Sequence, residues 1–260
     1  MAQKKPLFFR FIRRCVKAVY PKIGHQGLEN IPNEPVIIVG NHSQMNGPIA
    51  CELYTPGEHS TWCVSNMMFV KEVPSYAYQD FWSQKPKLLR PFYKVFSYLI
   101  APLAAYIFTR ADTIPVYHDS RILATFKKTV TRLEEGANVV IFPEDDTPRN
   151  QIINEFRDKF IDVAKLYYKR TGKEVCFVPM YLAPKLKTMY FGSPIRYCAT
   201  EDSAAERKRI CRHLMEEITA IACALPEHTV VPFNNVPKKQ YPTNRAAGTA
   251  NTKCEVQNAK

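Results

Sequence analysis

Two polar clusters in the sequence carry residue types that suit acid–base chemistry. The first, at residues 40–48, contains His42, and an imidazole with its ordinary pKa near neutrality can remove a proton from a hydroxyl or an amine. The second, at residues 142–150, contains three consecutive carboxylates, which could orient the imidazole, bind polar groups of an acceptor or coordinate a cation. They are Glu144, Asp145 and Asp146. The structural alternatives are a histidine at a strand end and an acidic turn that caps a helix.

The cysteines and the other histidines favour neither a nucleophile nor a metal site. The eight cysteines include no C-x-x-C pair, and several stand in apolar stretches, so we expect reduced, mostly buried thiols. Cys51 and Cys63 lie near His42 in the sequence, but nothing around them predicts a lowered thiol pKa. His59 and His118 have no spacing typical of metal ligands. We therefore expect no metal.

Both clusters directly follow short apolar runs that are typical of buried strands. Residues 35–40 read PVIIVG and residues 138–142 read NVVIF. Further strands are expected at 61–65, 175–181 and 188–191, and amphipathic helices at 120–135, 155–169 and 203–225. This alternation predicts an α/β fold in which a mixed, largely parallel central sheet is flanked by helices. Polar residues just beyond the strand ends are the expected site positions in such a sheet.

The positive charge is concentrated in segments that are also apolar and aromatic. The chain has 36 Lys and Arg against 24 Asp and Glu, a net charge of +12. Residues 1–22 carry seven basic residues and no acid, and residues 81–111 carry five and no acid. A nucleic-acid-binding protein more often spreads its charge over a folded face, so we expect no nucleic-acid partner. The composition favours an anionic membrane surface instead.

Neither basic segment is expected to cross a bilayer. The uncharged run at 95–109 makes about 22 Å of helix, shorter than the ~30 Å hydrocarbon core, and Pro102 is expected to interrupt it. We interpret residues 1–22 as a basic amphipathic membrane-binding segment and residues 81–111 as an interfacial or re-entrant insert; the alternative is a buried core helix. No secretory signal is evident. The expected location is the cytoplasmic face of a membrane, peripheral or attached to one leaflet.

Four sequence blocks, in order across residues 24–195, resemble the 1-acylglycerol-3-phosphate acyltransferase family, the glycerolipid acyltransferases with an N-H-x-x-x-x-D motif. They are residues 27–42, which end in Asn41-His42, then Ile114-Pro115-Val116, Phe142-Pro143-Glu144 and Val178-Pro179. The resemblance implies a glycerol-3-phosphate acyltransferase-like domain at 23–228. It also implies a role in phospholipid biosynthesis, in which a fatty acyl group moves from acyl-CoA or acyl carrier protein to a lysophospholipid. Lysophosphatidic acid is the first choice of acceptor, and no further cofactor is implied.

The same resemblance implies a role for individual residues. His42 would be the general base of a direct transfer, because no activated nucleophile stands beside it. Glu144 and Asp145 are assigned to the catalytic site, and Arg149 to the phosphate-binding role of the motif's arginine. The other substrate-binding candidates are Asn41, His118, Arg121 and Thr147. The polar tail at 229–260 is expected to be disordered.

The sequence departs from the family motif at two places. Gly47 stands where the family has aspartate, so the usual orienting partner of His42 is missing and a large rate penalty is expected. The candidate replacements are Glu144, Asp145, Asp146 and Glu52. The F-P-E-G-T-R block is also altered, and its two extra carboxylates repel a phosphate unless a cation intervenes. Two alternatives therefore stay open: a catalytically weak lipid-binding homologue, and an N-acyltransferase that makes an amino-acid or amine lipid.

Overall fold

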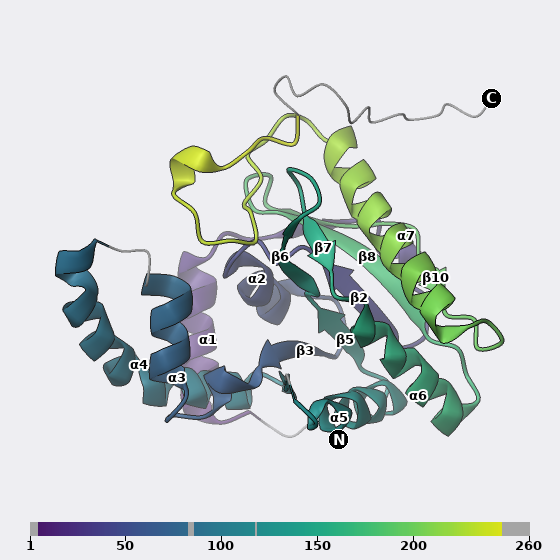
Figure 1. Cartoon of the computed structure of the whole chain (residues 1–260), viewed down its shortest axis with the longest axis horizontal. Helices are drawn as coiled ribbons and strands as arrows, with labels where there is room; N and C mark the ends of the chain where they lie inside the picture. Colours follow the sequence, from purple (N-terminus) through teal and green to yellow (C-terminus); the bar gives the residue numbers. More distant parts are fainter. Residues whose placement is uncertain (1–4, 83–85, 118, 246–260) are drawn as a thin grey trace.

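The chain folds around a mostly parallel sheet (Figure 1). The computed structural model describes residues 5–82, 86–117 and 119–245, so the predicted substrate-binding residue His118 lies outside them. The sheet has the strand order β1-β9-β8-β2-β5-β3-β4, and β10 pairs with β8. All neighbours are parallel except β8 with β9 and β8 with β10. The predicted α/β class, with a mixed and largely parallel sheet between helices, is therefore confirmed.

Most predicted elements are present with small shifts at their ends. The sheet strands are β1 Gly24–Gln26, β2 Val36–Gly40, β3 His59–Val64, β4 Thr113–Val116, β5 Asn138–Ile141, β8 Cys176–Ala183, β9 Thr188–Phe191 and β10 Ile195–Arg196, and β6 Glu144–Pro148 pairs with β7 Asn154–Phe156 in a separate hairpin. The α-helices are α1 Leu7–Val19, α2 Asn46–Tyr54, α3 Val73–Ala77, α4 Arg90–Arg110, α5 Ile122–Glu134, α6 Asp162–Thr171 and α7 Ser203–Ala224. Short helical turns are η1 Leu28–Asn30, η2 Ser65–Met68, η3 Tyr78–Trp82, η4 Lys87–Leu89, η5 Asp158–Ile161 and η6 Lys238–Gln240. The helix expected at 155–169 begins later, because β7 and η5 occupy its first residues.

Strand β2 shows why the central strands read as continuous apolar runs. Ile37 and Val39 pack into the cluster formed with α5, α6 and α7, whereas Val36 and Ile38 pack into the cluster on the α2 side. All four side chains are fully buried. Because helices cover both faces of the sheet, neither set of alternating side chains faces solvent, and both sets are apolar. Figure 1 shows the third group of helices, α3 and α4, beside the sheet rather than on its faces.

Helix α4 differs from the interrupted helix that we expected around Pro102. It runs unbroken from Arg90 to Arg110, 21 residues, which is about 31 Å of helix. The loss of one backbone donor at Pro102 therefore does not end it. Within the described ranges, residues 87–110 form the one helix that is long and apolar enough to cross a membrane by length and composition. Only 17% of its most apolar window is buried, which disfavours a core helix.

Residues 229–245, which we call the strap, also differ from the disordered tail that we expected. Val230 and Val231 are buried, and Thr229 and Thr243 form an isolated β-bridge. The Asn244 side chain accepts a hydrogen bond from the His228 N–H and donates one to the Ala222 carbonyl. These bonds between side chain and backbone order a segment whose composition resembles a linker. Residues 246–260 lie outside the described ranges.

Candidate active site

The two polar clusters meet because β2 and β5 are parallel neighbours. Ile38 pairs with Val140, so the carboxyl ends of both strands lie at one edge of the sheet. There, one carboxylate oxygen of Glu144 accepts a hydrogen bond from the His42 backbone N–H at 2.7 Å. The other oxygen accepts from the Asn154 N–H at 3.0 Å. A contact across 102 positions of sequence thus holds the main chain at His42.

Glu144 binds backbone rather than the imidazole. The residue is only 6% exposed, and burial raises the pKa of its carboxyl to about 7, against the effect of the two N–H donors. With both oxygens engaged by main-chain donors, this carboxyl fixes where the chain turns after β2 and at β7. Its role in the structure is therefore to position the His42 backbone.

The His42 ring is half-buried between two phenyl rings. Its centroid lies 5.3 Å from that of Phe142 and 5.6 Å from that of Phe233, and both contacts are edge-on. Its Nδ1 atom is buried and has no hydrogen-bond partner within the described residues. Burial lowers the pKa of this imidazole to about 4. The ring is therefore neutral near pH 7 and able to accept a proton.

The turn that carries His42 is held in an unusual backbone conformation. Ser43 and Gln44 have positive φ angles of 47° and 54°, a left-handed conformation that costs a non-glycine residue on the order of 1 kcal/mol. Asn41 offsets this strain. Its side chain accepts from the Leu182 N–H at 2.7 Å and donates to the Leu182 carbonyl at 3.1 Å and to Ser43 Oγ at 2.8 Å. Asn41 is buried, so it clips the turn to β8.

Gly47, at the position of the family's motif aspartate, leaves no room for a side chain. Its N–H donates to the His42 carbonyl at 3.0 Å. A Cβ atom built on Gly47 would lie 2.4 Å from that same oxygen, closer than real Cβ contacts. The conformation of this turn therefore excludes an aspartate at position 47. A carboxylate that orients the His42 ring would have to come from another part of the chain.

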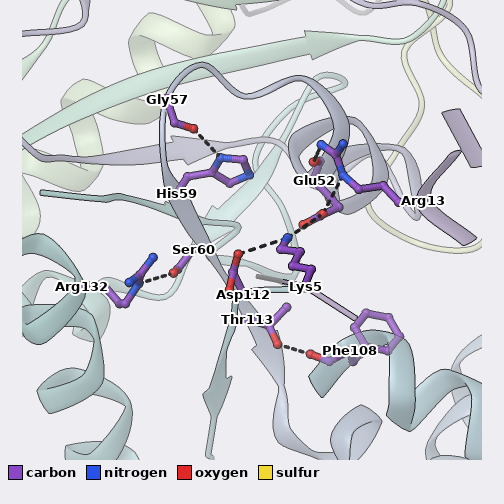
Figure 2. A network of polar contacts seen from close by, with 10 residues as sticks. All are labelled: Lys5, Arg13, Glu52, Gly57, His59, Ser60, Phe108, Asp112, Thr113 and Arg132. Atoms are coloured by element: carbon purple, nitrogen blue, oxygen red, sulfur yellow. Dashed lines mark hydrogen bonds and ion pairs between the residues drawn. The ribbon is translucent and has the colours of Figure 1, made fainter. Parts of the chain in front are cut away.

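The other predicted carboxylates do not reach the imidazole. Glu52 forms ion pairs with Lys5 at 3.3 Å and Arg13 at 3.1 Å, as Figure 2 shows, and so ties α1 to α2. One oxygen of Asp145 accepts from the Thr147 N–H at 2.7 Å, which closes the acidic turn locally. Asp146 is exposed. Within the described residues, therefore, none of the four candidates bonds Nδ1 of His42.

A cleft of about 1760 Å³ connects the site to α1 and α4. Its wall carries both apolar and polar side chains. The apolar residues that α1 and α4 contribute, which we call the apolar part, include Ile12, Val16, Ile100, Leu103 and Ile107. The polar and charged lining residues, which we call the polar part, include His42, Asp80, Asp146, Arg157 and Lys159, and residues 233–237 of the strap line the cleft as well. Such a cleft is large enough for a ligand with both a long apolar portion and a polar head.

Three of the predicted substrate-binding residues do not line this cleft, although Arg121 contacts two residues, Tyr117 and Asp119, that do. Arg149 forms an ion pair with Glu155 at 3.2 Å, and Arg121 forms one with Asp119 at 2.7 Å. The Arg121 guanidinium also lies 4.4 Å from the centre of the Tyr117 ring. Thr147 is exposed on the acidic hairpin. Neither arginine nor Thr147 lines the cleft.

Three cleft residues were missed by sequence reasoning. Arg157 and Lys159 follow β7, and within the described chain neither forms an ion pair. Both stand inside the helix that we expected at 155–169, so no sequence signal marked them as site residues. Phe233 lies in a segment that reads as a linker, so no local signal pointed to it. Burial raises the pKa of the Cys51 and Cys63 thiols to about 12, in line with our interpretation of both as unreactive.

The described residues include no group of three or more His, Cys, Asp or Glu side chains arranged to hold a metal ion. No family model matches the chain, and no curated protein does. Among solved structures, the chain is similar to the crystal structure of the 1-acyl-sn-glycerophosphate (LPA) acyltransferase, PlsC, from Thermotoga maritima. The identity is 14% and the TM-score 0.47, over 84% of this chain and 79% of that chain. A likeness at this level does not establish a family or an activity for this chain.

Proposed function

We propose that the protein is an acyltransferase that moves a fatty acyl group from acyl-CoA or acyl carrier protein to the hydroxyl of a lysophospholipid, with lysophosphatidic acid as the first choice. The observation that carries the proposal is the His42 imidazole, held at the carboxyl end of β2, in the lining of a large cleft that has both apolar and charged side chains. The ordered sequence blocks that resemble the glycerolipid acyltransferases support it.

In the proposed reaction His42 acts as general base. It takes the proton of the acceptor hydroxyl while the oxygen attacks the carbonyl carbon of the thioester. The carbon–sulfur bond then breaks, and the leaving thiolate takes the proton from the imidazolium. Because no carboxylate bonds Nδ1, the ring tautomer is not fixed by an acid, so the rate is expected to be lower than that of a His–Asp pair.

The polar part of the cleft holds charges of both signs, which leaves two acceptor classes. Arg157 and Lys159 suit a phosphate, as in lysophosphatidic acid. Burial raises the pKa of the Asp80 carboxyl, and the nearby charge of Asp146 raises it further. Two carboxylates this close favour a cationic group, so the second candidate function is N-acylation of an amine or amino-acid acceptor.

We also propose that α1 and α4 attach the protein to one leaflet of an anionic membrane, at its cytoplasmic face. Large apolar side chains are exposed on both helices, and the Phe8 and Tyr106 rings, 5.4 Å apart, bring the helices together. The most exposed are Leu7, Phe8, Phe11 and Val19 on α1, and Phe92, Val95, Tyr98 and Leu99 on α4. Exposed Arg10, Arg14 and Lys17 on α1 supply positive charge for anionic head groups.

The test is a transfer assay on anionic liposomes, with labelled acyl-CoA and acyl carrier protein donors and a panel of lysolipid and amine acceptors. We expect His42→Ala to lose activity by a factor of about 10² to 10⁴. The matched control, His213→Ala on α7, should keep it. An active His42→Ala enzyme would contradict the proposed base. Liposome binding without transfer for any donor and acceptor would favour the weak lipid-binding homologue.

A further inference from the structure

The strap, drawn in yellow in Figure 1, lines the cleft through residues 233–237 and is hydrogen-bonded to two separate elements of the cleft wall. On one side, Gln44 Nε2 donates to the Asn234 carbonyl at 3.0 Å, and the Tyr241 hydroxyl donates to Gln44 Oε1 at 3.0 Å. On the other side, Asn235 Nδ2 donates to the Asp80 carbonyl at 3.0 Å. The strap therefore links the turn that carries His42 to η3, next to α3.

The two ends of the strap are fastened to each other and to α7. The Val230 N–H donates to the Pro242 carbonyl at 2.9 Å, which closes the segment into a loop. Val230 is only 1% exposed, and Asn244 bonds the backbone of His228 and of Ala222. With its base held in this way, the loop presents Phe233 at a fixed place over the site.

Phe233 is the strap residue that touches the proposed base. Its ring lies edge-on to the His42 ring at 5.6 Å, and Phe142, from the end of β5, makes the second such contact at 5.3 Å. Between them Nδ1 of His42 is buried and has no partner in the described chain. Because Nδ1 is inaccessible to solvent, the packing around it keeps water away. Leaving this polar atom without a partner costs about 1–3 kcal/mol. Phe142 directly follows the last residue of β5, whereas Phe233 belongs to a loop far from the sheet in sequence.

We propose that the strap completes the catalytic pocket, with Phe233 as a positioning residue that holds the His42 ring in a dry orientation and thereby favours acyl transfer over hydrolysis. The inference rests on the proposed acyltransferase function. In the competing reaction a water oxygen attacks the thioester carbonyl, the carbon–sulfur bond breaks, and free fatty acid and thiol are released. Excluding water at the base suppresses this reaction without changing the chemistry of transfer.

The test uses the full chain and measures free fatty acid and acylated acceptor in the same liposome assay. We expect Phe233→Ala to raise the ratio of hydrolysis to transfer at least fivefold, and Phe233→Leu to change it little. Phe69→Ala is the matched control, because Phe69 is 44% exposed and does not line the cleft. An unchanged ratio in Phe233→Ala, with wild-type protein active, would overturn the inference and leave the proposed function standing.

A second measurement does not depend on activity. Diethyl pyrocarbonate modifies accessible neutral imidazoles, and its reaction at His42 can be followed by peptide mass spectrometry at pH 7. We expect Phe233→Ala to react several-fold faster at His42, and Phe69→Ala to react at the wild-type rate. If wild-type protein shows no transfer, this rate still decides whether the strap shields His42, and an unchanged rate overturns that shielding.

Tyr241→Phe provides a milder variant in case Phe233→Ala fails to fold. It removes only the hydroxyl that bonds Gln44, so the loop loses one tie to the His42 turn while its buried base is kept. We expect both readouts to move about twofold in the same direction as for Phe233→Ala. Wild-type values of both would overturn the inference.

Discussion

The two parts of the cleft differ in how far other residues of the chain contact their side chains. Around His42, Glu144, Asn41 and Gln44 all have partners within the fold, and they hold the turn from three sides. On α1 and α4, several large apolar side chains that do not line the cleft are mostly exposed. Phe92 is 64% exposed and Leu99 72% exposed. The fold itself thus holds the turn that carries His42, whereas we propose that lipid covers the exposed apolar side chains of the two helices.

The two helices of the apolar part are themselves held differently. Helix α1 is fastened by charge, through Arg13 and Lys5 to Glu52 and through Lys5 to Asp112 (Figure 2). Helix α4 packs through small buried residues, Ala101 and Ala105, in a cluster with α3. Small side chains allow close approach but bury little apolar area, so α4 keeps most of its apolar surface exposed.

The largest effect that tests this contrast is expected at Gly47. Gly47→Asp introduces the aspartate of the motif that the sequence blocks resemble, but its Cβ would meet the His42 carbonyl oxygen at 2.4 Å. We expect a loss of more than about 3 kcal/mol in the free energy of unfolding and no gain in activity. Urea unfolding followed by circular dichroism measures the loss. A stable and more active Gly47→Asp protein would show that the polar part is less rigid than its contacts indicate.

The apolar part should tolerate polar substitution in solution and fail only at a membrane. We expect the double variant Phe92→Ser with Leu99→Ser to keep its stability but to bind anionic liposomes about 100-fold more weakly, since each side chain contributes on the order of 1.5 kcal/mol when buried in lipid. Leu123→Ser on α5 is the control, because Leu123 is 60% exposed away from both helices. Liposome flotation gives the affinities. Equal binding by all three proteins would contradict membrane attachment through α4.

A smaller effect is expected from the two perturbed groups of the polar part. Burial raises the Glu144 pKa from 4.5 to about 7, so its contribution to stability is lost as pH rises through that range. Burial lowers the His42 pKa from 6.5 to about 4, so its contribution is lost as pH falls through that range. The two slopes oppose each other between about pH 4.5 and 6.5.

Glu144→Gln should therefore uncover the slope of His42. We expect its free energy of unfolding to rise with pH between 4.5 and 6.5 by up to about 1.4 kcal/mol per unit more than that of wild-type protein. Urea titrations at several pH values measure this, with Glu29→Gln, at an exposed position, as control. Parallel curves for Glu144→Gln and wild-type protein would show that the carboxyl is not perturbed as its burial indicates.

The smallest effect is expected at Arg149. Its ion pair with Glu155 is largely solvated, and such pairs contribute less than about 1 kcal/mol. We expect Arg149→Ala to change transfer to a phosphate-bearing acceptor less than twofold, whereas Arg157→Ala, inside the cleft, should raise the apparent KM about tenfold. Kinetics with lysophosphatidic acid distinguish the two. The reverse order would return Arg149 to the phosphate-binding role.

The sequence alone determined the sheet and the meeting of the two polar clusters. Apolar runs such as residues 36–40 and 176–183 are local signals, because a strand buried on both faces must be apolar throughout. Once β2 and β5 are parallel neighbours, His42 and Glu144 must lie at the same sheet edge. That much follows from the order of elements and from general rules of topology.

Only the tertiary structure decided what each side chain does there. Glu144 binds backbone instead of the imidazole, Arg149 pairs outside the cleft while Arg157 lines it, and α4 continues through Pro102. The strap is ordered by hydrogen bonds between side chains and backbone, which no sequence periodicity predicts. Its composition therefore gave no sign that Phe233 contacts His42. The direction of a side chain and the partner of a polar group depend on neighbours that are distant in the sequence, which is why the fold was readable from local patterns and the geometry of the site was not.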